Sequence, residues 1–411
     1  MSEQRPRVFM VGWEYPPHNS GGLGVACEGL TQALSEANGQ IFFTLPYHLS
    51  GDLSHMHVLT CQTSIDGDQD LTDHPPFLLY TPFISQPIEF TKNTTELSIL
   101  PQSQIEQQVN SYADQVANTG HRLRRKYDLI HAHDWMSFPA AMKLQEKTSK
   151  PFIAHVHSTE FDRIPNGRGS QYIADTEYLG MKQANRVIAV SYFTKRILVE
   201  KYNVDPNKID VVHNGVTPAS KLGADQLQFA PQRPMVVFMG RLTAQKGAEY
   251  FLQLARAVVD NIPNALFIIA GHGDQYHSLL FQSAYDQLSA SVLFTGFLRD
   301  RQREALLSRA DVFVMPSLSE PFGLVALEAA QRQTPVIVSQ TSGVKEVLSH
   351  ALQADFWDIK QMSKYITELI NDQDFRHTVV EGQNQDLNQA TWQDAATKVS
   401  TIYRNLLTKT R

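Results

Sequence analysis

The sequence has very little cysteine and no long apolar run. Cys27 and Cys61 are the only cysteines among 411 residues, too few for a disulfide framework, so we expect a reducing cytoplasm. The first apolar run, residues 8–12, is too short for the core of a signal peptide. No run approaches the roughly 20 apolar residues of a membrane-spanning helix. These absences predict a cytoplasmic protein whose cysteines serve packing.

The sequence also lacks an excess of positive charge. Its 36 Lys and Arg residues are outnumbered by 42 Asp and Glu, which gives a formal net charge of -6. A general nucleic-acid-binding protein is therefore not expected, because neutralising phosphates needs a basic face. A basic cluster does end one polar helical stretch: Arg122, Arg124, Arg125 and Lys126. Such a cluster usually forms a solvated helix end, and peripheral contact with anionic lipids at the inner membrane is the alternative.

Short apolar runs alternate with longer helical patterns along the whole chain. This alternation predicts parallel sheets wrapped by helices, and the length favours two domains. The predicted strands are residues 7–11, 40–44, 129–132, 152–156, 186–190 and 209–212, then 235–239, 266–270, 292–295, 312–315 and 335–339. Residues 60–101 are interpreted as an insertion of loops and short strands.

A segment with Pro and Gly, residues 218–232, interrupts the alternation and predicts a linker. Residues 1–217 are then expected to form one Rossmann-like, doubly wound domain, and residues 233–390 a second. The layout predicts that the two domains face each other across a cleft. An amphipathic helix follows the second sheet, near residues 391–408.

Two carboxylates, Glu320 and Glu328, lie eight positions apart around a Pro-Phe-Gly turn. The turn follows a predicted strand, and open α/β sheets bind ligands at the carboxyl ends of their strands. The N–H groups of residues 323–325, at the start of a predicted helix, favour an anion such as a phosphate. Glu328 can accept hydrogen bonds from a ribose and Glu320 from a second sugar, which suits a sugar nucleotide. The alternative is an ordinary amphipathic helix with a capped start.

Two basic residues follow the first strand of the second half. Arg241 offers a planar fork for a phosphate and Lys246 a compact charge, each charge-assisted hydrogen bond contributing about 1.5–3 kcal/mol. Two fixed cations can stabilise a departing diphosphate without a metal ion, although exposed cations often have no role. Gly271-His272-Gly273 resembles a fragment of a dinucleotide fingerprint. Since that fragment lacks the third glycine, we interpret it as a tight turn lining the nucleotide pocket.

Histidines end two strands of the first half. His131 and His133 precede Asp134, and His155 and His157 follow later. Alternation along a strand places each pair of histidines on one face of its strand. Such pairs near an aspartate can ligate zinc. At 131 and 155 we prefer neutral core histidines that are hydrogen-bonded to the backbone. We predict no metal site, because the two cations described above can neutralise a phosphate.

A glycine-rich turn, Gly21-Gly22-Leu23-Gly24, opens a predicted helix after the first strand. Positions without side chains let the backbone approach a ligand, and the helix start supplies N–H donors for negative charge. Glycine-rich turns also serve plain chain reversal. This turn therefore predicts a ligand only together with the other motifs.

Taken in chain order, these motifs resemble the retaining GT-B glycosyltransferases of family 4 (group 1), and are similar to bacterial members that resemble glycogen synthases. The resemblance covers residues 8–392. Its most specific element is the pair Glu320 and Glu328 with Pro-Phe-Gly between them. The other elements are Gly22-Leu23-Gly24, His133-Asp134-Trp135, His157, Asn214-Gly215-Val216, Gly240-Arg241 and Lys246-Gly247.

The resemblance implies a GT-B fold in which the C-terminal helix, residues 391–411, crosses back to the first domain. It also implies that His157 contacts the donor sugar near its reacting carbon and that Asp134 lies near the sugar or acceptor. The expected catalytic residues are His157, Arg241, Lys246, Glu320 and Asp134. The expected donor-binding residues are Gly22, Gly24, Gly240, Arg241, Lys246, Gly271, Gly273, Glu320, Phe322, Gly323, Leu324, Val325 and Glu328.

The expected function is a metal-independent, monomeric, retaining transferase with no cofactor beyond its nucleotide-sugar donor. The expected donor is UDP-glucose, and the expected acceptor is a saccharide or a lipid-linked saccharide in envelope or exopolysaccharide biosynthesis. Alternatives are glucan elongation as in glycogen and starch synthases, a GT-B epimerase and a phosphorylase-like enzyme. From other classes, the alternatives are a non-catalytic sugar-nucleotide sensor and a dinucleotide oxidoreductase.

Overall fold

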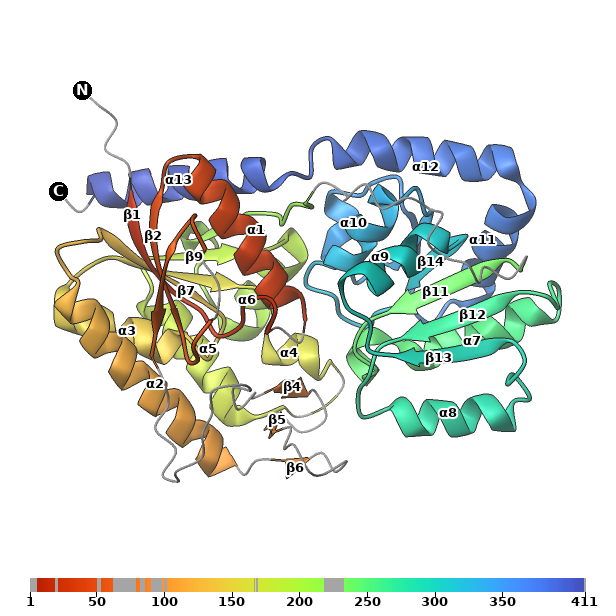
Figure 1. The fold of residues 1–411 in the computed structure, drawn as a ribbon, viewed down its shortest axis with the longest axis horizontal. Helices are drawn as coiled ribbons and strands as arrows, with labels where there is room; N and C mark the ends of the chain where they lie inside the picture. The colour runs from red at the N-terminus through yellow and green to blue at the C-terminus, as the bar shows by residue number, and fades with distance from the viewer. Residues whose placement is uncertain are drawn as a thin grey trace. The chain divides into compact units, whose positions relative to one another are not determined.

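The computed structural model describes residues 6–18, 21–49, 53–61, 79–81, 86–89, 98–99, 102–165, 167, 169–217 and 233–409. The predicted linker, residues 218–232, lies outside the described residues. The chain forms two compact units. The first unit comprises Met1–Gly215 and Trp392–Arg411, and the second comprises Val216–Thr391 (Figure 1).

The first unit is built on a seven-stranded parallel sheet with the order β10-β9-β8-β7-β1-β2-β3. Its strands are β1 (Arg7–Val11), β2 (Gln40–Leu45), β3 (His57–Thr60), β7 (Leu129–His133), β8 (Phe152–Val156), β9 (Arg186–Ala189) and β10 (Ile209–Val211). All residues of β7 and β8 are buried, as expected for parallel strands covered on both faces. The strand order reverses between β1 and β7, and such a reversal is where α/β sheets bind ligands.

The helices of the first unit are α1 (Gly22–Glu36), α2 (Gln102–Arg122), α3 (Phe138–Thr148), α4 (Glu160–Arg163), α5 (Gln171–Gln183), α6 (Tyr192–Tyr202) and α13 (Trp392–Lys409). α13 packs along α1, where a Cβ at Gly29 would lie 2.1 Å from the Trp392 ring. Gly29 therefore leaves the space that Trp392 occupies. The prediction that the last helix returns to the first domain is confirmed (Figure 1).

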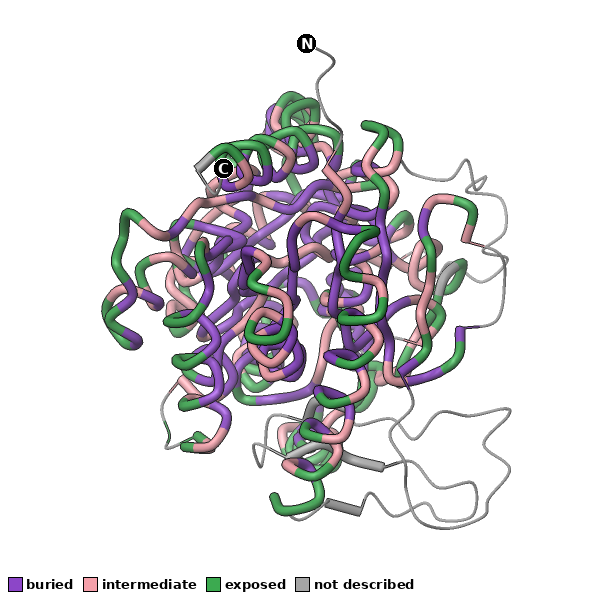
Figure 2. Tube along the Cα trace, turned by 90° about the vertical axis from the view of Figure 1, so that its left-hand side faces the viewer, coloured by how far each residue is buried: buried purple, intermediate pink, exposed green. Residues whose placement is uncertain are grey.

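Side-chain alternation gives the two faces of β7 different surroundings. Ile130 and Ala132 belong to a core that also contains Val109 and Val116 of α2. His131 faces the other way, where it contacts Tyr403 of α13. Figure 2 shows buried residues running through the central strands and exposed residues on the outer helical turns.

The second unit contains a six-stranded parallel sheet with the order β13-β12-β11-β14-β15-β16. Its strands are β11 (Met235–Met239), β12 (Leu266–Ala270), β13 (Val292–Gly296), β14 (Val312–Met315), β15 (Val336–Ser339) and β16 (Leu352–Ala354). Its helices are α7 (Ala248–Val259), α8 (Tyr276–Tyr285), α9 (Asp300–Arg309), α10 (Leu324–Gln331), α11 (Ile359–Asn371) and α12 (Gln373–Leu387). The strand order reverses between β11 and β14.

Every predicted strand is present, with ends that differ by no more than one residue. The short edge strands β3 and β16 and the helices α4, α11 and α12 were not predicted. Within the predicted insertion, residues 60–101, the structure describes a small antiparallel sheet of β4 (Leu79–Thr81), β5 (Gln86–Glu89) and β6 (Ser98–Ile99). Among the described residues, every helix is too short or too polar to cross a membrane.

Gly247 lies where two loops of the second unit approach each other closely. Its φ is 72°, and a Cβ there would lie 1.9 Å from the Pro316 carbonyl oxygen. Gly296 has the same φ of 72° but nothing within 4 Å of its Cβ position. We expect Gly296→Ala to cost about 1–2 kcal/mol of unfolding free energy, the cost of the left-handed backbone. Gly247→Ala should cost about 2–5 kcal/mol, because overpacking adds to that cost.

Urea denaturation of the two variants measures both costs under one condition. Equal destabilisation would contradict the predicted clash with Pro316 and leave only the backbone conformation as a cause.

Candidate active site

The predicted site residues occupy loops and helix starts beside the two reversal points. In the first unit, they follow β1, β7 and β8. In the second unit, they follow β11, β12 and β14. Each unit is described by itself.

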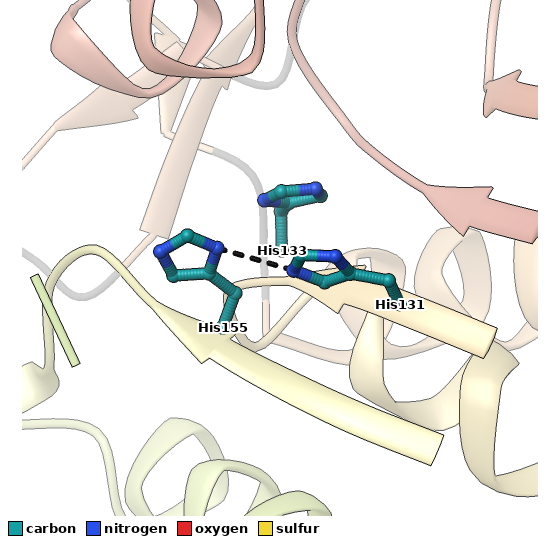
Figure 3. A group of neighbouring side chains, drawn as sticks. All are labelled: His131, His133 and His155. Carbon is teal, nitrogen blue, oxygen red and sulfur yellow. Dashed lines mark hydrogen bonds between the residues drawn. The ribbon is translucent and has the colours of Figure 1, made fainter. Parts of the chain in front are cut away.

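Three buried histidines, at 131, 133 and 155, form a cluster with the partly buried His157 at the ends of β7 and β8. His131 Nε2 and His155 Nδ1 lie 3.1 Å apart, and His133 Nδ1 and His157 Nε2 are also 3.1 Å apart. The rings of His131 and His133 stack with centroids 4.5 Å apart, as Figure 3 shows. The rings of His155 and His157 stack at 4.2 Å. Alternation along each strand therefore places the histidine pairs as predicted.

Burial keeps these imidazoles neutral. It lowers the pKa of His133 to about 3 and lowers the pKa of His131, His155 and His157 as well. This agrees with the interpretation of His131 and His155 as neutral core histidines. The predicted hydrogen bonds to the backbone are wrong, however, because the rings bond to the Tyr403 hydroxyl and to each other.

Nitrogen atoms of His131, His133 and His155 lie within 4.8 Å of one another, which is close enough to be considered for a metal ion. Both nitrogens of His131, however, already have hydrogen-bond partners. The rings of His131 and His133 are also stacked, with 21° between their planes, so they do not converge on one point. Coordination by His131 would require one of these two hydrogen bonds to break.

Asp134 connects the ends of β7 and β8. It has a φ of 59° and is almost fully buried, and its Oδ1 accepts hydrogen bonds from the N–H groups of His157 (2.7 Å) and Ser158 (3.4 Å). Burial raises the pKa of its carboxyl to about 7, while these hydrogen bonds and Arg163 act in the opposite direction. Asp134 thus fixes the backbone that carries His157.

A buried ion network behind His157 was missed by the sequence analysis. Arg163 lies 2.9 Å from Glu160 and 2.5 Å from Glu177, and its Nη1 donates to Ser158 Oγ at 3.0 Å. Tyr202 donates to Glu177. Burial raises the pKa of Glu177 to about 7, although Arg163 lowers it. The network links α4, α5 and α6 to Ser158, the residue that follows His157. The sequence does show charged residues after His157, but helix and strand periodicity does not indicate that they pair.

The glycine-rich turn lies at the start of α1, after β1. Gly22 is the first residue of α1 and is exposed, whereas Gly24 is buried within its first turn. Its N-cap residue, Gly21, has no side chain that could cap the helix. Its first N–H groups have no intrahelical acceptor, so they can receive an anionic ligand.

The clearest contact between predicted residues lies in the second unit. Lys246 Nζ is 2.6 Å from Glu320 Oε2, with the Lys246 side chain 20% exposed and that of Glu320 7% exposed. Ser317 Oγ also donates to Glu320 Oε2, at 3.2 Å. The ion pair joins the loop after β11 to the loop after β14, across the reversal point of the sheet.

The backbone also holds Glu320 in place. Its N–H donates to the Thr341 carbonyl at 2.9 Å, and its carbonyl accepts from Gly343 at 2.9 Å. Gly323 has a φ of 109° and ends the loop, and α10 begins at Leu324. The loop is therefore attached on both sides, to the loop after β11 and to the loop after β15.

The region from Phe322 to Val325 presents backbone donors. Phe322 is buried, and its carbonyl accepts from Val344 at 2.7 Å. The first N–H groups of α10, at Leu324 and Val325, have no intrahelical acceptor. This start of a helix can hold an anion.

Glu328 lies one turn further along α10. Its Oε1 is 3.5 Å from Arg303, whereas its buried Oε2 has no hydrogen-bond partner among the described residues. Burial raises the pKa of this carboxyl, although Arg303 and Arg332 lower it. Oε2 can therefore accept a hydrogen bond from a bound hydroxyl.

The glycines at 271 and 273 have a packing role. A Cβ at Gly271 would lie 1.8 Å from the Gly240 carbonyl oxygen, and one at Gly273 would lie 2.4 Å from the Leu242 carbonyl oxygen. Both are therefore required for the loop after β12 to contact the loop after β11. Gly240 is more open, with Phe238 at 3.8 Å as the nearest atom to its Cβ position.

Asp274 was not predicted as a site residue, yet its carboxyl interacts with the charge of Arg241. Burial raises the pKa of its carboxyl to about 7, and Arg241 is among the groups that lower it. The positive charge of Arg241 therefore favours the ionised form of Asp274. In the sequence, its position directly after Gly273 was the feature that could have identified it.

Two family profiles match successive parts of the chain. Residues 77–220 match Glycosyltransferase Family 4, and residues 223–386 match Glycosyl transferases group 1. An uncharacterized glycosyltransferase of Methanocaldococcus jannaschii is 28% identical over 417 residues, covering 97% of this chain and 98% of that protein. A glycogen synthase of Mycobacterium tuberculosis is 25% identical over 97% of this chain and 94% of its own length.

A solved structure resembles the whole chain. Anabaena HepE, in complex with UDP and glucose, has a TM-score of 0.72 and 16% identity, covering 97% of this chain and 99% of its own. At that identity, the likeness concerns the fold. The two matched profiles, the full-length relatives and the two parallel sheets agree: the chain belongs to the group 1 glycosyltransferases of family 4 and has the GT-B fold.

Proposed function

We propose that this glycosyltransferase moves glucose from UDP-glucose, with retention, to a saccharide or lipid-linked acceptor in envelope or exopolysaccharide biosynthesis. The contact that carries the proposal is the 2.6 Å ion pair between Lys246 and Glu320. The pair supports the proposal because it holds a cation beside the carboxylate of Glu320 at the reversal point of the second sheet, where a ligand is expected.

The leaving group would be the nucleotide diphosphate. Arg241 and Lys246 lie on the loop after β11, and the start of α10 adds backbone N–H donors from the other side of the reversal point. These groups are fixed before the reaction, so they stabilise the charge that develops on the departing phosphate without reorganisation. The acceptor hydroxyl would attack the face of the sugar that the diphosphate leaves.

The two glutamates would bind hydroxyl groups. Lys246 and Ser317 occupy Oε2 of Glu320, which leaves Oε1 for a hexose hydroxyl. The unpartnered Oε2 of Glu328 would accept from the ribose. Both roles use carboxylate oxygens as acceptors, which is the only hydrogen-bonding role an ionised carboxylate has.

The first unit would contribute His157 and Asp134 near the sugar. His157 Nδ1 is buried and has no hydrogen-bond partner among the described residues, so it can accept from or donate to a bound ligand. Asp134 would act through the backbone of His157 as well as near the sugar.

The choice of donor has support from the relatives. HepE was crystallised with UDP and glucose, and a glycogen synthase aligns over nearly the whole chain. That alignment also favours glucan elongation as a second candidate, in which a glucan chain is the acceptor.

A panel of sugar nucleotides tests the donor. We expect UDP-glucose to raise the Tm more than ADP-glucose, GDP-mannose or UDP-galactose, because a ligand at 100 times its Kd stabilises the folded state by about 2.7 kcal/mol. Turnover of UDP-glucose should continue in EDTA, since Arg241 and Lys246 bind the diphosphate. Loss of turnover in EDTA that Mg²⁺ restores would contradict metal independence. Binding without turnover, with glycogen and other acceptors supplied, would favour the sugar-nucleotide sensor.

Removing either cation tests the diphosphate site. Arg241→Ala and Lys246→Ala should each lower turnover about 10²–10³-fold, as expected when one preorganised donor to the transition state is lost. Arg256→Ala is the control, because Arg256 pairs with Asp260 on the exposed surface of α7 at 3.2 Å. Steady-state kinetics and a folding check by circular dichroism would accompany each variant. Turnover equal to wild type in both site variants would refute the assignment.

The raised pKa of Asp134, about 7, predicts a pH-dependent stability. An unfolded Asp has a pKa of about 3.9. Between these values the folded state binds a proton that the unfolded chain does not, so this group's contribution to stability falls as the pH rises from about 4 to 7. Asp134→Asn removes the charge and keeps an oxygen acceptor for His157. It should exceed wild type in unfolding free energy by about 1–4 kcal/mol at pH 8 and by much less at pH 5.

Urea denaturation across this pH range measures the difference between Asp134→Asn and wild type. Asp114→Asn, at an exposed residue that pairs with Lys143, is the control. A difference that does not change with pH would mean that Asp134 stays ionised throughout.

A further inference from the structure

Tyr403 joins the C-terminal helix to the buried histidines. Its hydroxyl lies 2.5 Å from His131 Nδ1, and Tyr403 is 1% exposed. His131 Nε2 continues the chain of hydrogen bonds to His155 Nδ1, at 3.1 Å (Figure 3). The His155 ring stacks on His157, with centroids 4.2 Å apart. A residue 272 positions away from His131 in the sequence is thus linked to the ring that supports His157.

The direction of this chain follows from counting hydrogen-bond partners. If Tyr403 donates to His131 Nδ1, the Nε2–H of His131 donates to His155 Nδ1, and only the Nε2–H of His155 lacks a partner. If the chain runs the other way, both the Tyr403 hydroxyl hydrogen and the lone pair of His155 Nε2 lack partners among the described residues. A buried polar group without a partner costs free energy, so the first direction is favoured.

All three groups are neutral, as this direction requires. Burial raises the pKa of the Tyr403 hydroxyl and lowers the pKa of both histidines. Tyr403 therefore keeps its proton, and each imidazole carries one proton on one nitrogen.

We propose that Tyr403 is a positioning residue for the donor-sugar site, which fixes His131 and His155 as their Nε2–H tautomers and so sets the ring on which His157 stacks. The proposal rests on the proposed role of His157 near the sugar. Without the hydroxyl, His131 Nδ1 loses its donor, and either tautomer of His131 and His155 becomes accessible. His157 would then rest on a ring whose hydrogen bond and orientation are no longer unique.

The matched variants are Tyr403→Phe and Tyr127→Phe. Each removes one buried hydroxyl from the first unit, but the Tyr127 hydroxyl donates to the Gly120 carbonyl, at 3.1 Å, and has no bond to the histidines. We expect Tyr403→Phe to lower kcat for UDP-glucose about 3- to 10-fold with little change in KM, the effect of losing one hydrogen bond that orients the site. Tyr127→Phe should leave kcat within about twofold of wild type. Equal losses in both variants would mean that general destabilisation is the cause and would overturn the proposal.

Nitrogen NMR of the free enzyme labelled with ¹⁵N-histidine tests the tautomers without any assay of transfer. The protonated and bare nitrogens of a neutral imidazole have well-separated chemical shifts, and His131→Gln and His155→Gln spectra assign the two rings. We expect wild type to carry the protons on Nε2 of both rings and Tyr403→Phe to show mixed tautomers. Protons on Nδ1 in wild type, or unchanged tautomers in Tyr403→Phe, would overturn the proposal.

The same spectra test whether a metal occupies the cluster instead. Stoichiometric Zn²⁺ should leave the His131 and His155 resonances unchanged if the two rings keep their hydrogen bond to each other. Shifted resonances would make them metal ligands and overturn the proposal. Because these measurements need no substrate, an absence of transfer by wild type would count against the proposed function and leave the tautomer result standing.

Discussion

In each unit the strand order reverses beside the first strand of the sheet, between β1 and β7 and between β11 and β14. Loops that leave neighbouring strands in opposite directions at that point cannot cover one another, so their residues remain available to a ligand. The Lys246–Glu320 ion pair spans the second reversal point, and Asp134 follows β7 beside the first. The close approach of Gly271 to the Gly240 carbonyl serves the same arrangement, because it packs the loop after β12 against the loop after β11.

Apart from the Arg163 network of the first unit, the predicted site residues of the two units are held differently. In the first unit, complete burial keeps the histidines uncharged, and they satisfy one another through hydrogen bonds and stacking. In the second unit, Lys246 and Glu320 keep some contact with solvent and can remain an ion pair. The fixed charges of the second unit are therefore the groups that we propose for the diphosphate. The first unit offers neutral imidazole and backbone groups, which suit an uncharged sugar.

The predicted strands were found because buried parallel strands are continuous apolar runs, such as residues 152–156 and 312–315. β3 and β16 were missed because they are short, only partly buried and lie at sheet edges. The positions of Lys246 and Glu320 next to strand ends could be predicted because they follow from local pattern, whereas their role in a site stays a prediction. The contacts of Arg163 with Glu177 and of Tyr403 with His131 could not be predicted, because tertiary packing brings these partners together from different elements. Gly271 was interpreted as part of a turn that lines the nucleotide pocket. The structure adds a packing reason for this glycine, because the Gly240 carbonyl leaves no space for a Cβ.

The first unit is built from two segments that lie far apart in the sequence, so it can be completed only after both have been synthesised. Trp392, Val399 and Tyr403 of α13 are buried in it, and Tyr403 supplies the hydroxyl partner of His131. The seven strands of the first sheet are complete at Val211, yet α13 is made only after the whole second unit. Until then, His131 lacks the Tyr403 hydroxyl that is its hydrogen-bond partner. A first unit that folds early therefore has its sheet before it has its site, and the histidine cluster reaches its final arrangement only when the second unit has been synthesised.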